Sequence, residues 1–107
     1  MRCNWITLGV SLLATALLAA PAKSEDKSAA TYKQKCAACH GPDGKGDTPA
    51  GKSTKVRSFA DPEIAKQSDD DLAAVIDKGK NKMPAYGKSL KPEEIKALVA
   101  YVRSLAK

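Results

Sequence analysis

The chain has 107 residues and a formal net charge of +6, from 18 basic and 12 acidic side chains. A chain of this length forms a single domain that is too small to bury a generous hydrophobic core, and such domains often need a metal or disulfides for stability. Excess positive charge can attract nucleic acid or a membrane surface. Here the lysines are scattered and are not interleaved with aromatic residues, which argues against nucleic acid and favours an acidic protein partner.

The first 22 residues have the pattern of a secretory signal peptide. Arg2 provides a positive start, residues 6–20 form an apolar run, and Ala20-Pro21-Ala22 provides a cleavage site, with a second possible site two residues further on. The alternative is an uncleaved membrane anchor, but the apolar run is shorter than the roughly 20 residues that a spanning helix needs. We therefore expect that Cys3 is removed with the signal peptide. Residues 23–107 would then form one exported domain without stable membrane insertion.

The first helix of this domain is expected from Glu25 to Cys39, and it leads into the sequence Cys36-Ala37-Ala38-Cys39-His40. C-x-x-C-H is the attachment signature of c-type haem. Positions i, i+3 and i+4 of a helix share one face, so two thiols can bond to the two vinyl groups of a haem while the imidazole reaches the iron from the same side. The sequence therefore predicts a haem c that is covalently attached at Cys36 and Cys39, with His40 as a ligand of its iron.

The same cysteine pair also occurs in three other kinds of site. A thioredoxin-like redox pair expects a strand and a βαβ unit, and the sequence shows neither. A zinc site usually needs four Cys or His ligands, and the one further candidate, Cys3, is expected to leave with the signal peptide. A disulfide between Cys36 and Cys39 would leave His40 unexplained. A metal-binding or disulfide-containing module without haem remains an alternative that the mass of the mature protein would distinguish.

Residues 41–79 are expected to form a loop followed by two helices. The loop from Gly41 to Gly51 is rich in glycine and proline. A short helix is predicted near Asp61-Pro62, where proline occupies the first turn. A longer helix is predicted from Asp69 to Lys78, with Ser68 as its N-cap and Gly79 after its end. This second helix is expected to bury three apolar side chains: Leu72, Val75 and Ile76.

Two features are expected in the last third of the chain. Met83 lies beside Pro84 in an otherwise polar loop between Gly79 and Leu90. A lone methionine is usually core filler, but a thioether is also a soft metal ligand. A closing helix begins at Pro92, with acidic residues in its first turn and basic residues towards its end. Its apolar stripe consists of Ile95, Leu98, Val99, Val102 and Leu105.

From about Lys27 to Lys107 the chain resembles a small class I c-type cytochrome of the short bacterial or photosynthetic kind. Four stretches carry the resemblance, of which the first and third are specific: Cys36–His40, Gly41–Gly46, Lys82–Gly87 and Pro92–Val102. The resemblance implies an all-α domain with the small cytochrome c fold. Such a domain has about four helices around one covalently bound haem, and its closing helix crosses the first helix.

The resemblance also suggests which residues surround the haem. His40 and Met83 would be the axial ligands of the iron, an arrangement that raises the reduction potential. The carbonyl of Pro49 would accept the other ring N–H of His40, a kind of bond that fixes the orientation of a ligand histidine. Phe59, the only phenylalanine, is expected to pack against the haem. Arg57 is a candidate for binding a haem propionate, because a guanidinium can hold a carboxylate through two hydrogen bonds.

The expected function is that of a periplasmic single-electron carrier. We do not expect an enzyme, because two protein ligands would leave no open position on the iron for a substrate. Lysines around the haem edge would steer an acidic redox partner; the candidates are Lys45, Lys52, Lys78, Lys80, Lys82 and Lys88. The alternative is a haem enzyme or gas sensor with an open or displaceable sixth ligand, which carbon monoxide binding by the ferrous protein would reveal.

Overall fold

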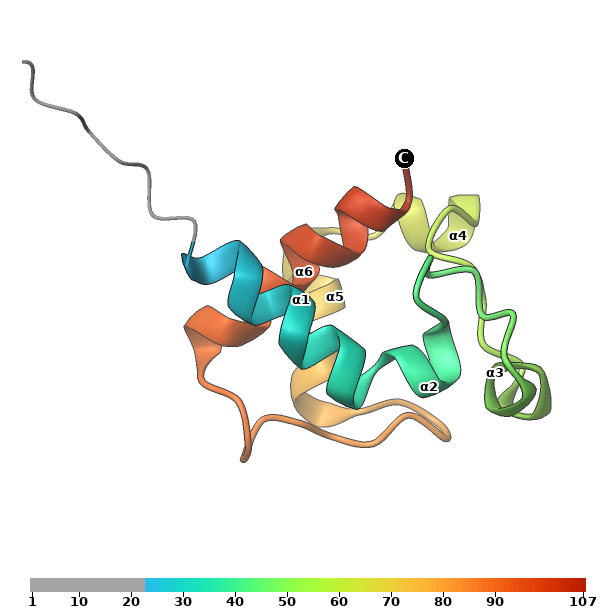
Figure 1. The fold of residues 1–107 in the computed structure, drawn as a ribbon, viewed down its shortest axis with the longest axis horizontal. Coiled ribbons are helices and arrows are strands. Elements are labelled where there is room, and N and C mark those ends of the chain that lie inside the picture. The colour runs from blue at the N-terminus through green and yellow to red at the C-terminus, as the bar shows by residue number, and fades with distance from the viewer. Residues whose placement is uncertain (1–22) are drawn as a thin grey trace, which may run out of the picture.

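The structure is a computed structural model that describes residues 23–107. The predicted signal peptide and its cleavage site lie outside the described residues. Within them the chain forms six helices and no strand (Figure 1): α1 Lys23–Lys35, α2 Ala37–His40, α3 Pro49–Thr54, α4 Pro62–Ala65, α5 Asp69–Lys78 and α6 Pro92–Leu105. The predicted all-α fold is confirmed. None of the described helices is both long and apolar enough to cross a membrane.

Local sequence signals set most of the helix ends. Ser68 accepts a hydrogen bond from the Asp71 amide at 3.1 Å and so caps α5, whose first turn holds three aspartates. Negative charge is favourable there because the helix dipole is positive at its N-terminus. Asp61 caps α4 in the same way, through the Glu63 amide at 2.9 Å. The predicted boundaries of α5 and the start of α6 at Pro92 are confirmed.

The first helix differs from the prediction, because it does not continue through the cysteine motif. α1 ends at Lys35 and α2 begins at Ala37, with Cys36 between them at φ −116°. This φ is far from the value of about −63° in a regular helix. The Cys36 carbonyl accepts the amides of both Cys39, at 3.2 Å, and His40, at 2.9 Å. The motif therefore forms its own short turn of helix at the end of α1.

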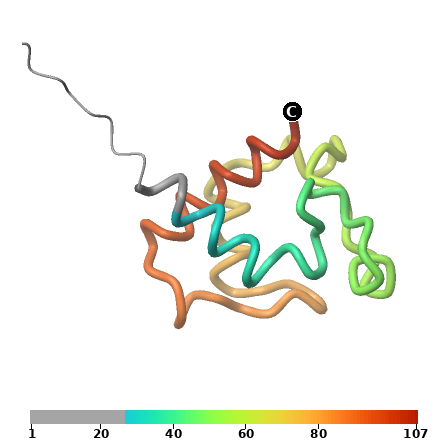
Figure 2. Tube along the Cα trace, in the orientation of Figure 1, coloured from blue at the N-terminus to red at the C-terminus, as the bar shows by residue number. Residues whose placement is uncertain are grey.

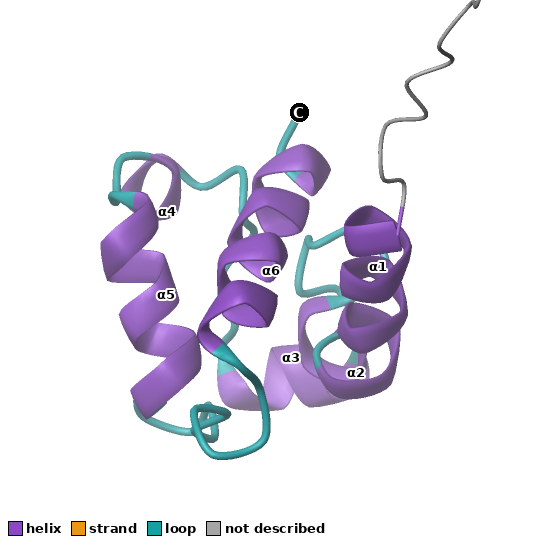
Figure 3. Cartoon of the chain, turned by 90° about the vertical axis from the view of Figure 1, so that its left-hand side faces the viewer, coloured by secondary structure: helices purple, strands orange, loops and turns teal. Residues whose placement is uncertain are grey.

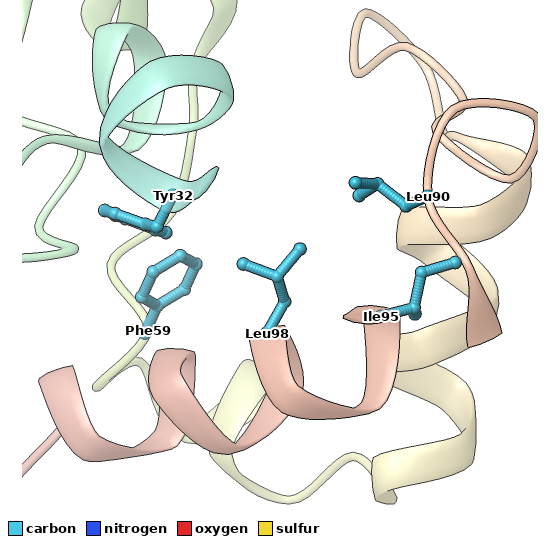
Figure 4. Packing of buried hydrophobic residues seen from close by; sticks show 5 residues of the cluster. All are labelled: Tyr32, Phe59, Leu90, Ile95 and Leu98. Carbon is cyan, nitrogen blue, oxygen red and sulfur yellow. The ribbon is translucent and has the colours of Figure 1, made fainter. Parts of the chain in front are cut away.

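The core lies where α6 crosses the other helices. α6 packs against α1 on one side and α5 on the other, an arrangement visible in Figure 3. Figure 4 shows Leu98 between the Tyr32–Phe59 pair and the Leu90–Ile95 pair, all five of which are buried. The expected crossing of the first and closing helices is therefore present.

Several apolar side chains are less buried than the sequence suggests. Leu72, Val75 and Ile76 of α5 are half-buried, as are Val102 and Leu105 of α6. The expectation that α5 buries Leu72, Val75 and Ile76 is therefore wrong, since none of its residues is fully buried. The reason is that α5 packs mainly on one neighbour, α6, so the rest of its surface lies at the outside of the bundle.

An arginine near the end of α6 fixes the connection between α4 and α5. The half-buried Arg103 donates from Nη2 to the Gln67 carbonyl at 2.5 Å and from Nη1 to the Ala65 carbonyl at 3.4 Å. Its Nε forms an ion pair with Asp69 at 2.5 Å. One guanidinium thus satisfies two loop carbonyls and neutralises an acidic residue of the α5 first turn.

Candidate functional site

The cysteine and histidine side chains lie together on the turn formed by Cys36 and α2. Both Cys36 and Cys39 are half-buried free thiols, and burial raises the pKa of the Cys36 thiol. The His40 ring stacks on Phe59 with the ring centres 4.8 Å apart. Burial lowers the pKa of His40, so the imidazole is neutral at pH 7. A neutral imidazole has the free lone pair that a metal ligand needs.

The buried Nδ1 atom of His40 has no hydrogen-bond partner among the described residues. Buried polar atoms in proteins are nearly always paired, so an unpaired ring nitrogen beside two free thiols is a feature that needs an explanation. Two thiols, a neutral imidazole and a buried aromatic ring fit the attachment of a haem c. The residues present therefore suit the cofactor that the sequence motif predicts.

The C-terminal end of α2 is held by the loop that follows it. The Thr48 hydroxyl lies 2.7 Å from the Ala38 carbonyl and 3.0 Å from the Cys39 carbonyl, and it accepts the Gly51 amide at 2.8 Å. The Gly46 amide donates to the His40 carbonyl at 2.7 Å. These bonds satisfy carbonyls that a short helix leaves without internal partners, and they fix the backbone of the motif.

Tyr32 connects α1 to the chain immediately after the motif. Its side chain is 2% exposed, and its hydroxyl donates to the Gly41 carbonyl at 2.6 Å. Its ring meets Tyr101 of α6 at 5.1 Å and Phe59 at 6.2 Å between ring centres. Burial raises the pKa of Tyr32. Tyr32 is thus a core residue that also fixes the backbone beside His40.

Met83 lies at the end of a tight turn. The amides and carbonyls of Lys80 and Met83 bond to each other at 2.9 and 3.1 Å. Between them Asn81 has φ 54°, a left-handed conformation that asparagine tolerates better than most residues. Before the turn, Gly79 has φ 76° and ψ 170°, a region that is essentially restricted to glycine. The backbone of the half-buried Met83 is therefore well defined.

The segment that carries Met83 lies against the end of α1. It runs along the lower edge of the molecule in Figure 2, below the chain that enters the motif. Tyr86 of this segment donates its hydroxyl to the Lys35 carbonyl at 3.1 Å. Burial raises the pKa of Tyr86, and the charges of Cys36 and Cys39 raise it further. Segments 51 residues apart in sequence thus meet here.

Three further predicted site residues have different surroundings. Phe59 is buried and packs on His40, as a residue close to the cofactor would. Pro49 is exposed at the first position of α3, and the expected bond from the His40 ring is not formed, because Nδ1 has no partner. Arg57 is exposed, and none of the ion pairs among the described residues includes it. The structure therefore does not connect Pro49 or Arg57 to the other site residues.

Sequence reasoning missed Thr48 and Tyr86 as residues of the site. Thr48 precedes Pro49, and a threonine before a proline is typical of a helix N-cap and first position, so α3 itself could have been predicted. Tyr86 lies in the stretch from Lys82 to Gly87 that carries the family resemblance. Its contact with Lys35, however, depends on how distant segments pack, and no local pattern indicates it.

Comparison with known proteins identifies the family. The family profile described as cytochrome c oxidase, cbb3-type, subunit III matches residues 23–102. The chain is a small class I c-type cytochrome. It is similar to a protein named cytochrome c6 from Nostoc sp. (strain PCC 7120), with 36% identity over 99 residues that cover 91% of this cytochrome and 86% of the relative.

Solved structures agree with the family assignment. The KustC0563 c-type cytochrome superimposes with a TM-score of 0.68 and 40% identity, covering 75% of this cytochrome and 98% of that chain. A tyrosine-to-phenylalanine mutant of Kustc0563 superimposes with a TM-score of 0.66 and 39% identity, covering 73% of this cytochrome and 96% of that chain. The cytochrome therefore has the small cytochrome c fold and carries covalently bound haem c. It is an electron carrier that acts with redox partners.

Proposed function

We propose that this cytochrome is a periplasmic single-electron carrier, with haem bonded to Cys36 and Cys39 and with His40 and Met83 as the iron ligands. The hydrogen bond from Tyr86 to the Lys35 carbonyl carries the proposal, because it brings the Met83 segment to the cysteine motif. The two free thiols of Cys36 and Cys39 on the same turn as His40 support it as well. Met83 is the sole methionine of the described residues, and His40 is the sole histidine of the chain.

The protein contributes ligands and a partly dry environment to this chemistry. Haem c supplies a one-electron ferric/ferrous couple. The neutral His40 and the Met83 thioether would fill both axial positions, and a soft thioether favours the ferrous state. Phe59 stacks on the His40 ring, and Cys36 and Ala37 pack against the core cluster that contains Tyr32 and Phe59. With no position left for a substrate, the site supports electron transfer and not catalysis.

The proposed periplasmic location rests on the signal-peptide pattern of residues 1–22, since covalent haem attachment to bacterial proteins is expected outside the cytoplasmic membrane. The protein from a periplasmic extract should begin at residue 23 or shortly after it. An N-terminus at Met1 in the membrane fraction would instead support the alternative of an uncleaved anchor.

Spectra of the native protein test the ligand proposal. The precursor is expressed with a haem-maturation system, and ferric, ferrous and ferrous-plus-carbon-monoxide spectra are recorded. We expect a low-spin spectrum that carbon monoxide does not change, and a mass that includes one haem. Ready binding of carbon monoxide would favour the alternative, a haem enzyme or gas sensor with an open or displaceable sixth position.

The cytochrome is expected to dock on an acidic partner through exposed lysines around the site. Six lysines of the loops and helix ends are exposed: Lys45, Lys52, Lys78, Lys80, Lys82 and Lys88. Steering of this kind accelerates association by about 10-fold or more and weakens as salt shortens the Debye length from about 30 to about 10 Å. The rate of electron transfer to an acidic partner should therefore fall by about 10-fold between low and moderate ionic strength.

A charge-reversal pair provides the control for docking. Lys82→Glu should reduce the rate at low salt and flatten its salt dependence. Lys107→Glu makes the same charge change at the C-terminus, which lies across the molecule from the Met83 segment in Figure 1, and it should have a smaller effect. Equal effects of the two variants, or a rate that is insensitive to salt, would contradict docking at the surface around Lys82 and the Met83 segment.

The turn that carries Met83 should tolerate no side chain at Gly79. A Cβ there would lie 2.6 Å from the Met83 carbonyl oxygen, and the backbone conformation itself costs a non-glycine residue about 1–3 kcal/mol. Gly79→Ala should therefore lower the thermal midpoint and weaken Met83 ligation, seen as loss of the weak red absorption band of methionine-ligated ferric haem. Asn81→Gly, which suits the positive φ of that residue, should keep the native thermal midpoint and the absorption band of Met83 ligation.

A further inference from the structure

Tyr86 fastens the Met83 segment, residues 79–90, to two helices. Its hydroxyl donates to the Lys35 carbonyl at the end of α1, at 3.1 Å. Its backbone amide donates to the Ile76 carbonyl in the last turns of α5, at 2.9 Å. Its carbonyl accepts the Leu90 amide at 2.9 Å. One residue thus joins α1, α5 and the connection to α6.

The next residue strengthens the attachment to α5. The Gly87 amide donates to the Asp77 carbonyl at 3.0 Å. A Cβ at Gly87 would collide with the Asp77 carboxylate and would lie 2.9 Å from the Asp77 carbonyl oxygen. The segment therefore lies directly on the end of α5. On the other side of Met83, the Lys80–Met83 turn is equally well defined. Met83 lies between two fixed points of the backbone, and one of them is Tyr86.

The position of the Tyr86 hydrogen bond relates it to the haem site. Its acceptor, the Lys35 carbonyl, belongs to the residue directly before Cys36. The Lys35 ammonium also lies 6.0 Å from the centre of the Tyr86 ring, a cation–π distance. A large movement of the Met83 segment away from the cysteine motif would have to break this bond. Ligands held by hydrogen-bonded neighbours keep their geometry, whereas unsupported ones do not.

From these contacts we propose that Tyr86 is a positioning residue for Met83: its hydroxyl, bonded to the Lys35 carbonyl, resists the opening that would let the Met83 sulfur leave its ligand position. The inference rests on the proposed ligation of iron by Met83. It assigns to Tyr86 a role in the strength of the sixth ligand, and not merely in the stability of the fold. The affinity of an external ligand that competes with Met83 measures this role.

Tyr86→Phe removes the hydroxyl and keeps the ring. Imidazole is titrated into the ferric, haem-loaded variant, and unfolding by denaturant is measured in parallel. Imidazole binds only to the fraction of molecules in which Met83 has moved away. At 3.1 Å the bond is slightly longer than a typical O–H···O hydrogen bond. Its loss should make imidazole bind about 2- to 10-fold more tightly. A role in folding alone would change the unfolding midpoint and leave the imidazole affinity unchanged.

Tyr101→Phe is the matched control. Tyr101 is also half-buried, and among residues 23–107 its hydroxyl has no hydrogen-bond partner. The Tyr101→Phe variant should bind imidazole with the affinity of the native protein. Gly87→Ala tests the same idea without altering Tyr86, because its Cβ collides with the side chain and approaches the carbonyl of Asp77 and so pushes the segment away from α5. This variant should also bind imidazole more tightly.

The outcomes separate this inference from the proposed function. If the native ferric protein shows the methionine-ligation band but Tyr86→Phe binds imidazole no better than Tyr101→Phe, the role of Tyr86 is refuted and Met83 ligation stands. If Tyr86→Phe does not take up haem, unchanged imidazole affinity in Gly87→Ala refutes the inference, and tighter binding supports it. If the native protein lacks the band, Met83 ligation fails, and the role of Tyr86 fails with it.

Discussion

Met83→Ala is expected to convert the cytochrome into a protein that binds carbon monoxide in its ferrous form. The substitution removes the proposed sixth ligand and leaves in place the stacking of His40 on Phe59 and the backbone hydrogen bonds of His40 to Cys36 and Gly46. Because the thioether favours ferrous iron, the reduction potential should also fall by at least about 60 mV. For a one-electron couple this corresponds to a tenfold change in the equilibrium constant for reduction. Carbon monoxide titration and a redox titration of the native and variant proteins measure both effects.

A neighbouring lysine could replace the missing thioether and hide the effect. Lys80 and Lys82 flank Met83 and are exposed, so the variant is also prepared with both changed to arginine, which stays charged and is a poor ligand. The result would count against Met83 ligation if that variant still showed the native low-spin spectrum and resisted carbon monoxide. Carbon monoxide binding by the native ferrous protein would also count against Met83 ligation.

The chemistry of this protein could be predicted from sequence because its signals are local. The C-x-x-C-H motif occupies five consecutive residues, and it alone indicates covalently bound haem c. The α5 boundaries follow from Ser68 before the helix and Gly79 after it, both of which act within one turn of the chain. Family membership and the all-α fold followed from the same short stretches.

The features that sequence reasoning missed depend on packing between distant segments. The α1 helix stops before Cys36 although its residues could continue a helix, and the turn that follows is held by Thr48 from the next loop. The contact between Tyr86 and Lys35 spans 51 positions. The expected bond from His40 to Pro49 assumed a loop that turns back towards the ring, whereas Pro49 begins an exposed helix instead.

Gly51→Ala is expected to destabilise the cytochrome and disturb the haem site, although helix propensity predicts the opposite. Gly51 lies inside α3, where alanine is favoured over glycine by about 0.5–1 kcal/mol. A Cβ at this position, however, would collide with the Cys39 carbonyl oxygen and lie 2.5 Å from the Gly46 carbonyl oxygen. Both atoms belong to the backbone around His40 and cannot move aside as a flexible side chain would.

Packing should outweigh propensity here, because overpacking a tight site costs about 1–3 kcal/mol. In a domain of this size, each kcal/mol of lost unfolding free energy lowers the thermal midpoint by roughly 4–8 °C. The displaced Cys39 carbonyl should also reduce the fraction of chains that carry haem, measured by mass spectrometry. Ser53→Ala, an exposed change in the same helix, should stay within about 0.5 kcal/mol of native stability. A Gly51→Ala protein with a raised midpoint and full haem content would show that α3 does not pack closely on the cysteine motif.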